Sequence, residues 1–202
     1  MLRRFQRLLA CAFLLGFGVS AAMAEDGSRP AATTSRLGRW EAGFAYNFVH
    51  SNAPPGGCGC FSMNGGSASL GLWVSQHWAA VGEVAVQHAS NVNDSGQDLT
   101  LASYLFGPRL QIHPSARVKP FAQILAGAAH ASGSYAPGAA DYPGSPNAFA
   151  MATGAGLSVS LSSRLAIQAP EVDYYLTRFN NSGNDHQNNV RVSAGLTWRF
   201  GM

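Results

Sequence analysis

Hydrophobic residues alternate with small or polar residues along most of the chain. In residues 40–48 the even positions are hydrophobic, as at Phe44 and Phe48, and the odd positions are small or polar, as at Glu41 and Asn47. A period of two places successive side chains on opposite faces of a β-strand. Similar alternation predicts seven further strands, in residues 67–74, 78–87, 102–112, 122–128, 154–161, 171–176 and 190–200.

The segments between the predicted strands alternate in length. Residues 50–64, 89–98, 131–147 and 179–188 form long connections, whereas residues 75–76, 113–116 and 162–163 form short turns. An even number of alternating strands with this arrangement is typical of bacterial outer-membrane β-barrels. We therefore predict an all-β fold, a closed eight-stranded antiparallel up-and-down transmembrane β-barrel with four extracellular loops. At Pro108 and Pro170 we expect bulges, because proline cannot donate a ladder hydrogen bond.

The composition supports a membrane protein that crosses with strands. Only 11% of the 202 residues are charged, compared with about 25% in soluble domains. After the start of the chain there is no run of 18 apolar residues, so helical spans are disfavoured.

The first residues have the pattern of an export signal. Arg3, Arg4 and Arg7 precede an apolar stretch, residues 8–19, and Ala22 and Ala24 flank Met23 in a small-residue cleavage motif. We predict a cleaved signal peptide in residues 1–24, a short periplasmic segment in 25–36 and the barrel in 37–202. Three of the 13 basic residues lie in the signal peptide, so the remaining 10 equal the 10 acidic residues. This balance does not favour nucleic-acid binding, which requires a basic face.

The last strand carries a family resemblance. The segment "RVSAGLTWRF" contains Ser193, Gly195, Trp198 and Phe200. With the strand pattern, it resembles the eight-stranded outer-membrane barrels, the group that contains the OmpA barrel domain, OmpX and the opacity-type adhesins. The resemblance covers residues 37–202. It implies a monomer in the bacterial outer membrane, surrounded by outer-membrane lipids and lipopolysaccharide, in which those four residues signal to the outer-membrane assembly machinery.

If the hydrophobic face meets lipid, the charged residues of the strands point into the barrel, because hydrocarbon does not solvate charge. These residues are Glu41, Glu83, Arg109, Glu171, Asp173, Arg191 and Arg199. Counting positions from the periplasmic end predicts three ion pairs between neighbouring strands, Glu41 with Arg199, Glu83 with Arg109 and Asp173 with Arg191. Eight strands enclose a lumen that their own side chains fill. We expect a plugged lumen, and a narrow channel for ions or small solutes is the alternative.

Two sequence features offer candidate chemistry. His88 and Ser90, in "HASN", resemble the His-x-Ser-Asn of outer-membrane lipid A deacylases, but the expected downstream Glu is replaced by Asp94 and Asp98. Such a site requires a carboxylate that orients the histidine. In the first loop, Cys58 and Cys60 lie one residue apart, where a disulfide would be strained and a metal site would lack the usual spacing.

No nucleotide-binding loop, zinc signature or paired catalytic carboxylates occur in the sequence, so we expect no cofactor and no metal. The pattern favours a non-enzymatic barrel with a structural, adhesion or surface-interaction role, whose extracellular ligand the sequence does not identify. A lipid A-modifying enzyme that uses His88 and Ser90 is the alternative from a different class.

Overall fold

The computed structural model describes residues 38–52, 60–139, 144–180 and 186–201. The predicted signal peptide (1–24), the segment 25–36 and Cys58 lie outside the described residues. In the described part of the chain, no helix has the length and hydrophobicity needed to cross a membrane. The strands are β1 (Arg39–Asn52), β2 (Cys60–Trp73), β3 (Trp78–Ala89), β4 (Leu99–Gln111), β5 (Val118–Ser132), β6 (Asn147–Ser160), β7 (Leu165–Thr177) and β8 (Gln187–Phe200), with a short 3₁₀ turn, η1 (Val92–Asp94).

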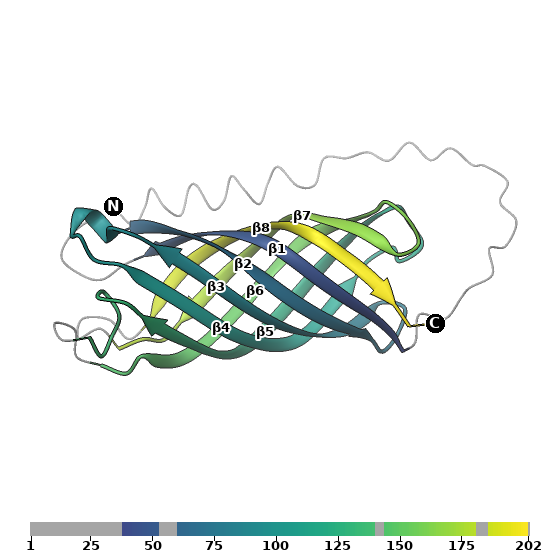
Figure 1. Ribbon diagram of the computed structural model, residues 1–202. Coiled ribbons are helices and arrows are strands. Elements are labelled where there is room, and N and C mark those ends of the chain that lie inside the picture. Colours follow the sequence, from purple (N-terminus) through teal and green to yellow (C-terminus); the bar gives the residue numbers. More distant parts are fainter. Residues whose placement is uncertain (1–37, 53–59, 140–143, 181–185, 202) are drawn as a thin grey trace, which may run out of the picture. The chain divides into compact units, whose positions relative to one another are not determined.

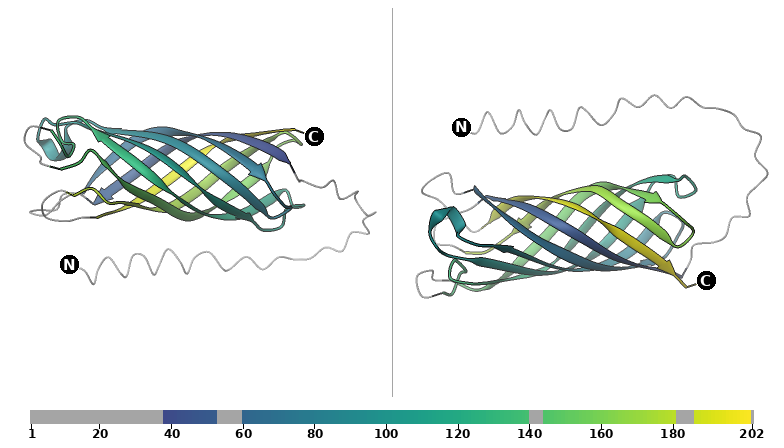
Figure 2. Two further views of the ribbon diagram at one scale, coloured as in Figure 1. Left: turned by 90° about the horizontal axis from the view of Figure 1, so that it is seen from below. Right: turned by 45° about the horizontal axis from the view of Figure 1, so that its top comes forward.

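The strands form one closed barrel in which each strand pairs antiparallel with its neighbours in the chain. Closure is made by β1 and β8, whose paired residues extend from Trp40 opposite Phe200 to His50 opposite Val190. The tilted strands surround a common axis, and β8 lies beside β1 in Figure 1 and in both views of Figure 2. The predicted fold class is confirmed.

The two ends of the barrel differ in their connections. The turn that contains η1 lies at one end, whereas β1 begins and β8 finishes at the other (Figure 1). The strands extend further toward the long connections than we predicted. Residues 50–64 were expected to form a loop, but β1 continues to Asn52 and β2 begins at Cys60. This difference arises because the ladder continues through polar residues, with His50 opposite Ser62.

The outer surface of the barrel is apolar. Phe44 is 70% exposed and Phe106 is 66% exposed, values far above those of aromatic residues in a soluble protein core. Their neighbours along the strands, such as Gly43 and Leu105, are buried on the inner face. Such an outer band is what a lipid-embedded barrel requires.

A β-bulge in β7 determines which of its side chains face inward. Before the bulge Gln168 is buried, and after it Glu171 and Asp173 are buried. The register against β8 shifts by one residue between Gln168 and Glu171, around Pro170. An unbroken alternation from Gln168 would have directed both carboxylates toward lipid. The expectation of a bulge at Pro108 is wrong, because the register between β4 and β5 is the same before and after that residue.

Candidate functional site: the barrel interior

The part of the interior near the short turns contains a buried ion pair between the first and last strands. Glu41 on β1 lies opposite Arg199 on β8, and Arg199 Nε donates to Glu41 Oε2 at 2.8 Å. The other carboxylate oxygen of Glu41 is 3.6 Å from Arg109 Nη1. The structure therefore brings Glu41 and Arg199 together as the sequence predicted, and adds a second arginine.

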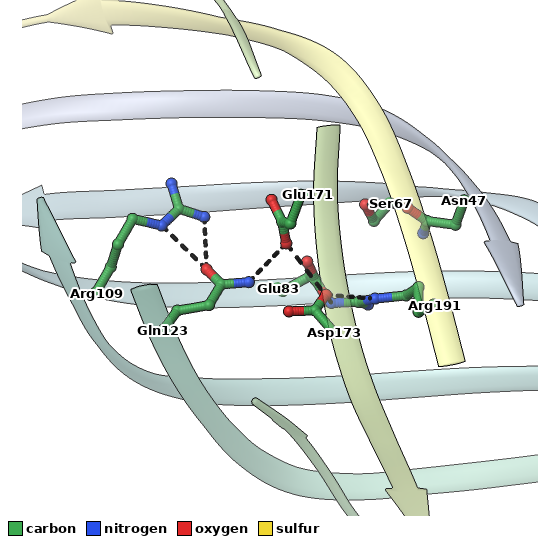
Figure 3. Close-up of polar contacts among 8 residues, drawn as sticks. All are labelled: Asn47, Ser67, Glu83, Arg109, Gln123, Glu171, Asp173 and Arg191. Atoms are coloured by element: carbon green, nitrogen blue, oxygen red, sulfur yellow. Dashed lines mark hydrogen bonds and ion pairs between the residues drawn. The ribbon is translucent and has the colours of Figure 1, made fainter. Parts of the chain in front are cut away.

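Arg191 is the centre of a larger cluster in the middle of the barrel (Figure 3). Its side chain is fully buried, and its Nη2 and Nε donate to Asp173 Oδ2 at 2.8 and 3.0 Å. Its Nη1 donates to Glu83 at 2.5 Å, across the lumen from β8 to β3. A third carboxylate, Glu171, lies 4.0 Å from Nη2. One guanidinium thus faces three acidic side chains.

Gln123 joins the two charged clusters. Its side-chain oxygen accepts hydrogen bonds from Arg109 Nε and Nη2 at 3.0 and 2.8 Å, and its amide donates to Glu171 Oε1 at 2.7 Å. Figure 3 shows this amide between the arginine and the carboxylate. The guanidinium of Arg109 also stacks over the ring of Phe121, 4.7 Å from its centroid, a favourable cation–π position. Sequence reasoning did not identify Gln123, because a neutral side chain has no opposite charge to match.

The predicted pairing of Glu83 with Arg109 is wrong. The register places Glu83 opposite Leu105, and Arg109 opposite Ala79. Glu83 contacts Arg191 instead, and Arg109 contacts Glu41 and Gln123. The prediction compared only neighbouring strands, whereas β3 and β8 are separated by two strands and meet through the lumen.

Toward the end with the long connections, the interior contains apolar side chains beside buried polar ones such as Gln87 and Asn189. Val49, Met63 and Leu101 are buried on the inner faces of β1, β2 and β4. They belong to one cluster with residues from the long connections, namely Val92, Ala136 and Phe179. Tyr175 lies at the boundary with the charged half, where Arg191 is 5.6 Å from its ring centroid. The sequence contained a signal for this cluster, because Val49 and Leu101 are hydrophobic residues at positions of the alternation that are otherwise small or polar.

His88 and Ser90 lie at the outer rim, away from the interior. His88 is exposed on β3, and its Nδ1 is 2.9 Å from Thr100 Oγ1 on β4. Asp94 accepts a hydrogen bond from the Asn91 side chain. The ring nitrogen of His88 thus contacts a hydroxyl where a catalytic site of this type requires a carboxylate.

The remaining predicted site residues have clear positions. Trp198 and Phe200 point outward from β8, and Ser193 is buried on its inner face. Gly195 packs so closely on β1 that an added Cβ would overlap the backbone and side chain of Ala45. Cys60 is exposed at the start of β2 and is a free thiol in this structure. Within the described residues, no group of three His, Cys, Asp or Glu side chains is arranged to hold a metal ion.

Comparison with known proteins agrees with this architecture. The model of the outer membrane protein beta-barrel domain matches residues 9–200. The crystal structure of Neisserial surface protein A (NspA) is similar with a TM-score of 0.61 and 15% identity, over 80% of this chain and 96% of that one. For Ail, the attachment invasion locus protein of Yersinia pestis, the TM-score is 0.55 and the identity 17%, over 81% of this chain and 99% of that one. For the outer membrane protein OprG from Pseudomonas aeruginosa, the TM-score is 0.55 and the identity 10%, over 82% of this chain and 97% of that one.

At these identities, the solved structures show a shared fold alone. No curated protein matches the sequence.

Proposed function

Because the chain belongs to the outer membrane protein beta-barrel domain family, we propose that it is a non-enzymatic surface-interaction protein of the bacterial outer membrane. In this proposal the barrel is an anchor with a lumen plugged by its own side chains. The loops at the extracellular end make the contacts with an external ligand or surface. Export through a cleaved signal peptide, and assembly guided by the last strand, are parts of the same proposal.

The organisation of the second and third loops carries this proposal. The backbone N–H of Asp98 donates to Ser134 Oγ, and the N–H of Tyr135 donates to the Asp98 carbonyl, both at 3.0 Å. The Tyr135 ring meets Phe61 edge-on, with ring centroids 6.2 Å apart. Two loops that are distant in sequence are thus joined to each other, and the third loop also contacts the start of β2. A surface ordered before binding loses less conformational entropy when a partner docks.

The interior of the barrel supports an anchor rather than a conduit. Charged side chains and Gln123 are hydrogen-bonded to one another across its middle, and apolar side chains such as Met63 and Leu101 are buried in its interior toward the long connections. An eight-stranded barrel has room for little more than these side chains. The lipid A-modifying alternative is not favoured, because the His88 ring contacts the Thr100 hydroxyl.

The experiment compares two double variants on living cells. A laboratory strain displays the wild-type protein, Ser134→Ala with Tyr135→Ala, or Ser75→Ala with Ser162→Ala. The second pair is the control, since Ser75 and Ser162 accept backbone N–H groups in the short turns at the opposite end. Adherence is measured on immobilised laminin, on fibronectin and on cultured epithelial cells.

We expect wild-type cells to adhere severalfold better than cells with an empty vector on at least one surface. The loop double variant should lose that gain and the turn double variant should keep it, at equal surface expression. Wild-type adherence equal to the empty vector on all three surfaces would contradict the proposal, as would equal losses in the two double variants.

A further inference from the structure

A pocket of about 290 Å³ opens at the periplasmic end of the barrel, far from the loops. We call it the basic pocket, and define it by the residues Arg39, Ser163, Arg164, Trp198, Arg199 and Phe200. Its lining residues come from the start of β1, the end of β8 and the turn before β7. Arg199 on β8 pairs by register with Glu41, two residues after Arg39 on β1, and its N–H donates to the Arg164 carbonyl at 2.7 Å.

The arginines of the basic pocket have different partners. Arg199 is buried and its guanidinium is held by Glu41 and the hydroxyls of Ser158 and Ser160. Arg39 is half-buried and Arg164 is exposed, and neither forms an ion pair within the described part of the chain. Within the described residues, two guanidinium groups without an ion-pair partner therefore line the pocket beside a third that is already neutralised. Arginine donors arranged in this way suit the oxygens of a phosphate group.

The distribution of charge strengthens this inference. Of the described acidic residues, Glu41, Glu83, Glu171 and Asp173 are buried in the lumen, and Asp94 and Asp98 lie at the loop end. In the turn before β5, the exposed side chain of Arg117 adds a further positive charge to the same end of the barrel. The described residues of this rim are thus positive, and none of them is an exposed carboxylate.

The aromatic side of the pocket indicates an amphiphilic ligand. Trp198 and Phe200 are 50% and 44% exposed on the outer surface of β8, where aromatic residues mark the level of lipid headgroups. The pocket therefore joins the arginines at the barrel mouth to the surface that meets lipid chains. A soluble anion would contact the arginines and leave the exposed aromatic side chains without a role.

We propose that the basic pocket binds the headgroup of an anionic phospholipid from the periplasmic leaflet. The phosphate lies between Arg39 and Arg164, the Ser163 hydroxyl is available as an additional donor, and the acyl chains follow Trp198 and Phe200. The lipid would tie the turn between β6 and β7 to the start of β1. This inference concerns the opposite end of the barrel from the proposed recognition surface and does not depend on it.

The test measures lipid selectivity on the reconstituted protein. Electron paramagnetic resonance of spin-labelled lipids gives the association of phosphatidylglycerol relative to phosphatidylcholine at the barrel surface. The variants are Arg39→Gln, Arg164→Gln, the two combined, and Arg39→Lys with Arg164→Lys. Arg117→Gln is the matched control, because it removes an exposed arginine from the same end but outside the pocket.

We expect wild-type protein to prefer phosphatidylglycerol, and each pocket glutamine variant to lower the preference by about threefold to fivefold, as for one arginine near an anionic lipid surface. The combined glutamine variant should lose the preference, and the lysine variant should retain part of it. Arg117→Gln should change it by less than either pocket variant. Equal losses from Arg117→Gln and the pocket variants would overturn the proposal in favour of diffuse attraction to the whole rim.

A second arm separates lipid from soluble phosphate. Inorganic phosphate at millimolar concentration is added to the reconstituted protein at constant ionic strength. Unchanged selectivity supports a lipid held by both its headgroup and its chains. Displacement of phosphatidylglycerol at that concentration would overturn the lipid assignment and identify the pocket as a site for a soluble anion.

Discussion

The two halves of the barrel interior are filled in different ways. From its middle to the end with the short turns, buried arginines and carboxylates from β1, β3, β4, β7 and β8 contact one another through hydrogen bonds and ion pairs. At the end with the long connections, Val49, Met63 and Leu101 pack against residues from those connections, beside buried polar side chains such as Gln87 and Asn189. The same strands supply both halves, so the difference comes from the identity of the inward-facing residues.

The two halves differ in what the loss of one side chain costs the folded barrel. In the charged half each side chain forms ion pairs or hydrogen bonds with its neighbours. Removal of Arg191 therefore leaves Glu83 and Asp173 as buried charges without their main partner. Buried unpaired charge is among the most costly defects in a protein. In the apolar half a lost side chain leaves a cavity, and neighbours from loops can partly close it. We therefore expect the charged half to be the less tolerant of substitution.

The largest effect is expected from Arg191→Met. It leaves Glu83 and Asp173 without their shared partner, and we expect a loss of about 3–5 kcal/mol in the free energy of unfolding. Urea titration of the protein in phospholipid vesicles, followed by tryptophan fluorescence, measures this loss. Adding Glu83→Gln and Asp173→Asn should recover part of it, because of the three carboxylates around Arg191 only Glu171 then remains, and the Gln123 amide still donates to it. A loss below about 1 kcal/mol for the single variant, the range of an exposed ion pair, would show that water reaches the cluster.

A smaller effect is expected in the apolar half from Leu101→Ala. Leu101 is buried in the cluster near the loop end, and its truncation should cost about 2 kcal/mol, toward the lower end for large-to-small core substitutions. The same urea titration measures it. A cost equal to or above that of Arg191→Met would reverse the comparison and make the apolar half the less tolerant part.

Much of the architecture could be predicted from the sequence, because the lipid solvent imposes a strict period of two on an exposed strand. Phe44 and Phe106 illustrate the outward set. The ends of the strands were harder to place. At the rim the outward residues become polar, as at His50 and Ser62, so the hydropathy pattern fades while the ladder continues.

The interior contacts were predictable only where strands are neighbours. Glu41 and Arg199 are opposite each other in the ladder between β1 and β8, and Asp173 and Arg191 are opposite each other between β7 and β8. The contact of Glu83 with Arg191 crosses the lumen. Which residues meet in this way depends on the tilt of the strands and on the length of the arginine side chain. The bulge before Glu171 also had to be placed correctly, since one residue of register exchanges the two faces of a strand.

The smallest effect is expected on conductance, and it tests whether the apolar half closes the lumen by itself. The triple variant Arg191→Ala, Glu83→Ala and Asp173→Ala removes the central cluster but leaves Met63 and Leu101 in place. Because an apolar constriction excludes water and ions, planar-bilayer recordings of this variant should show no stable conductance, as for the wild type. Adding Met63→Ser and Leu101→Ser should produce stable openings. Openings in the triple variant alone would mean that the charged half is the seal and that the apolar half serves only to anchor the loops.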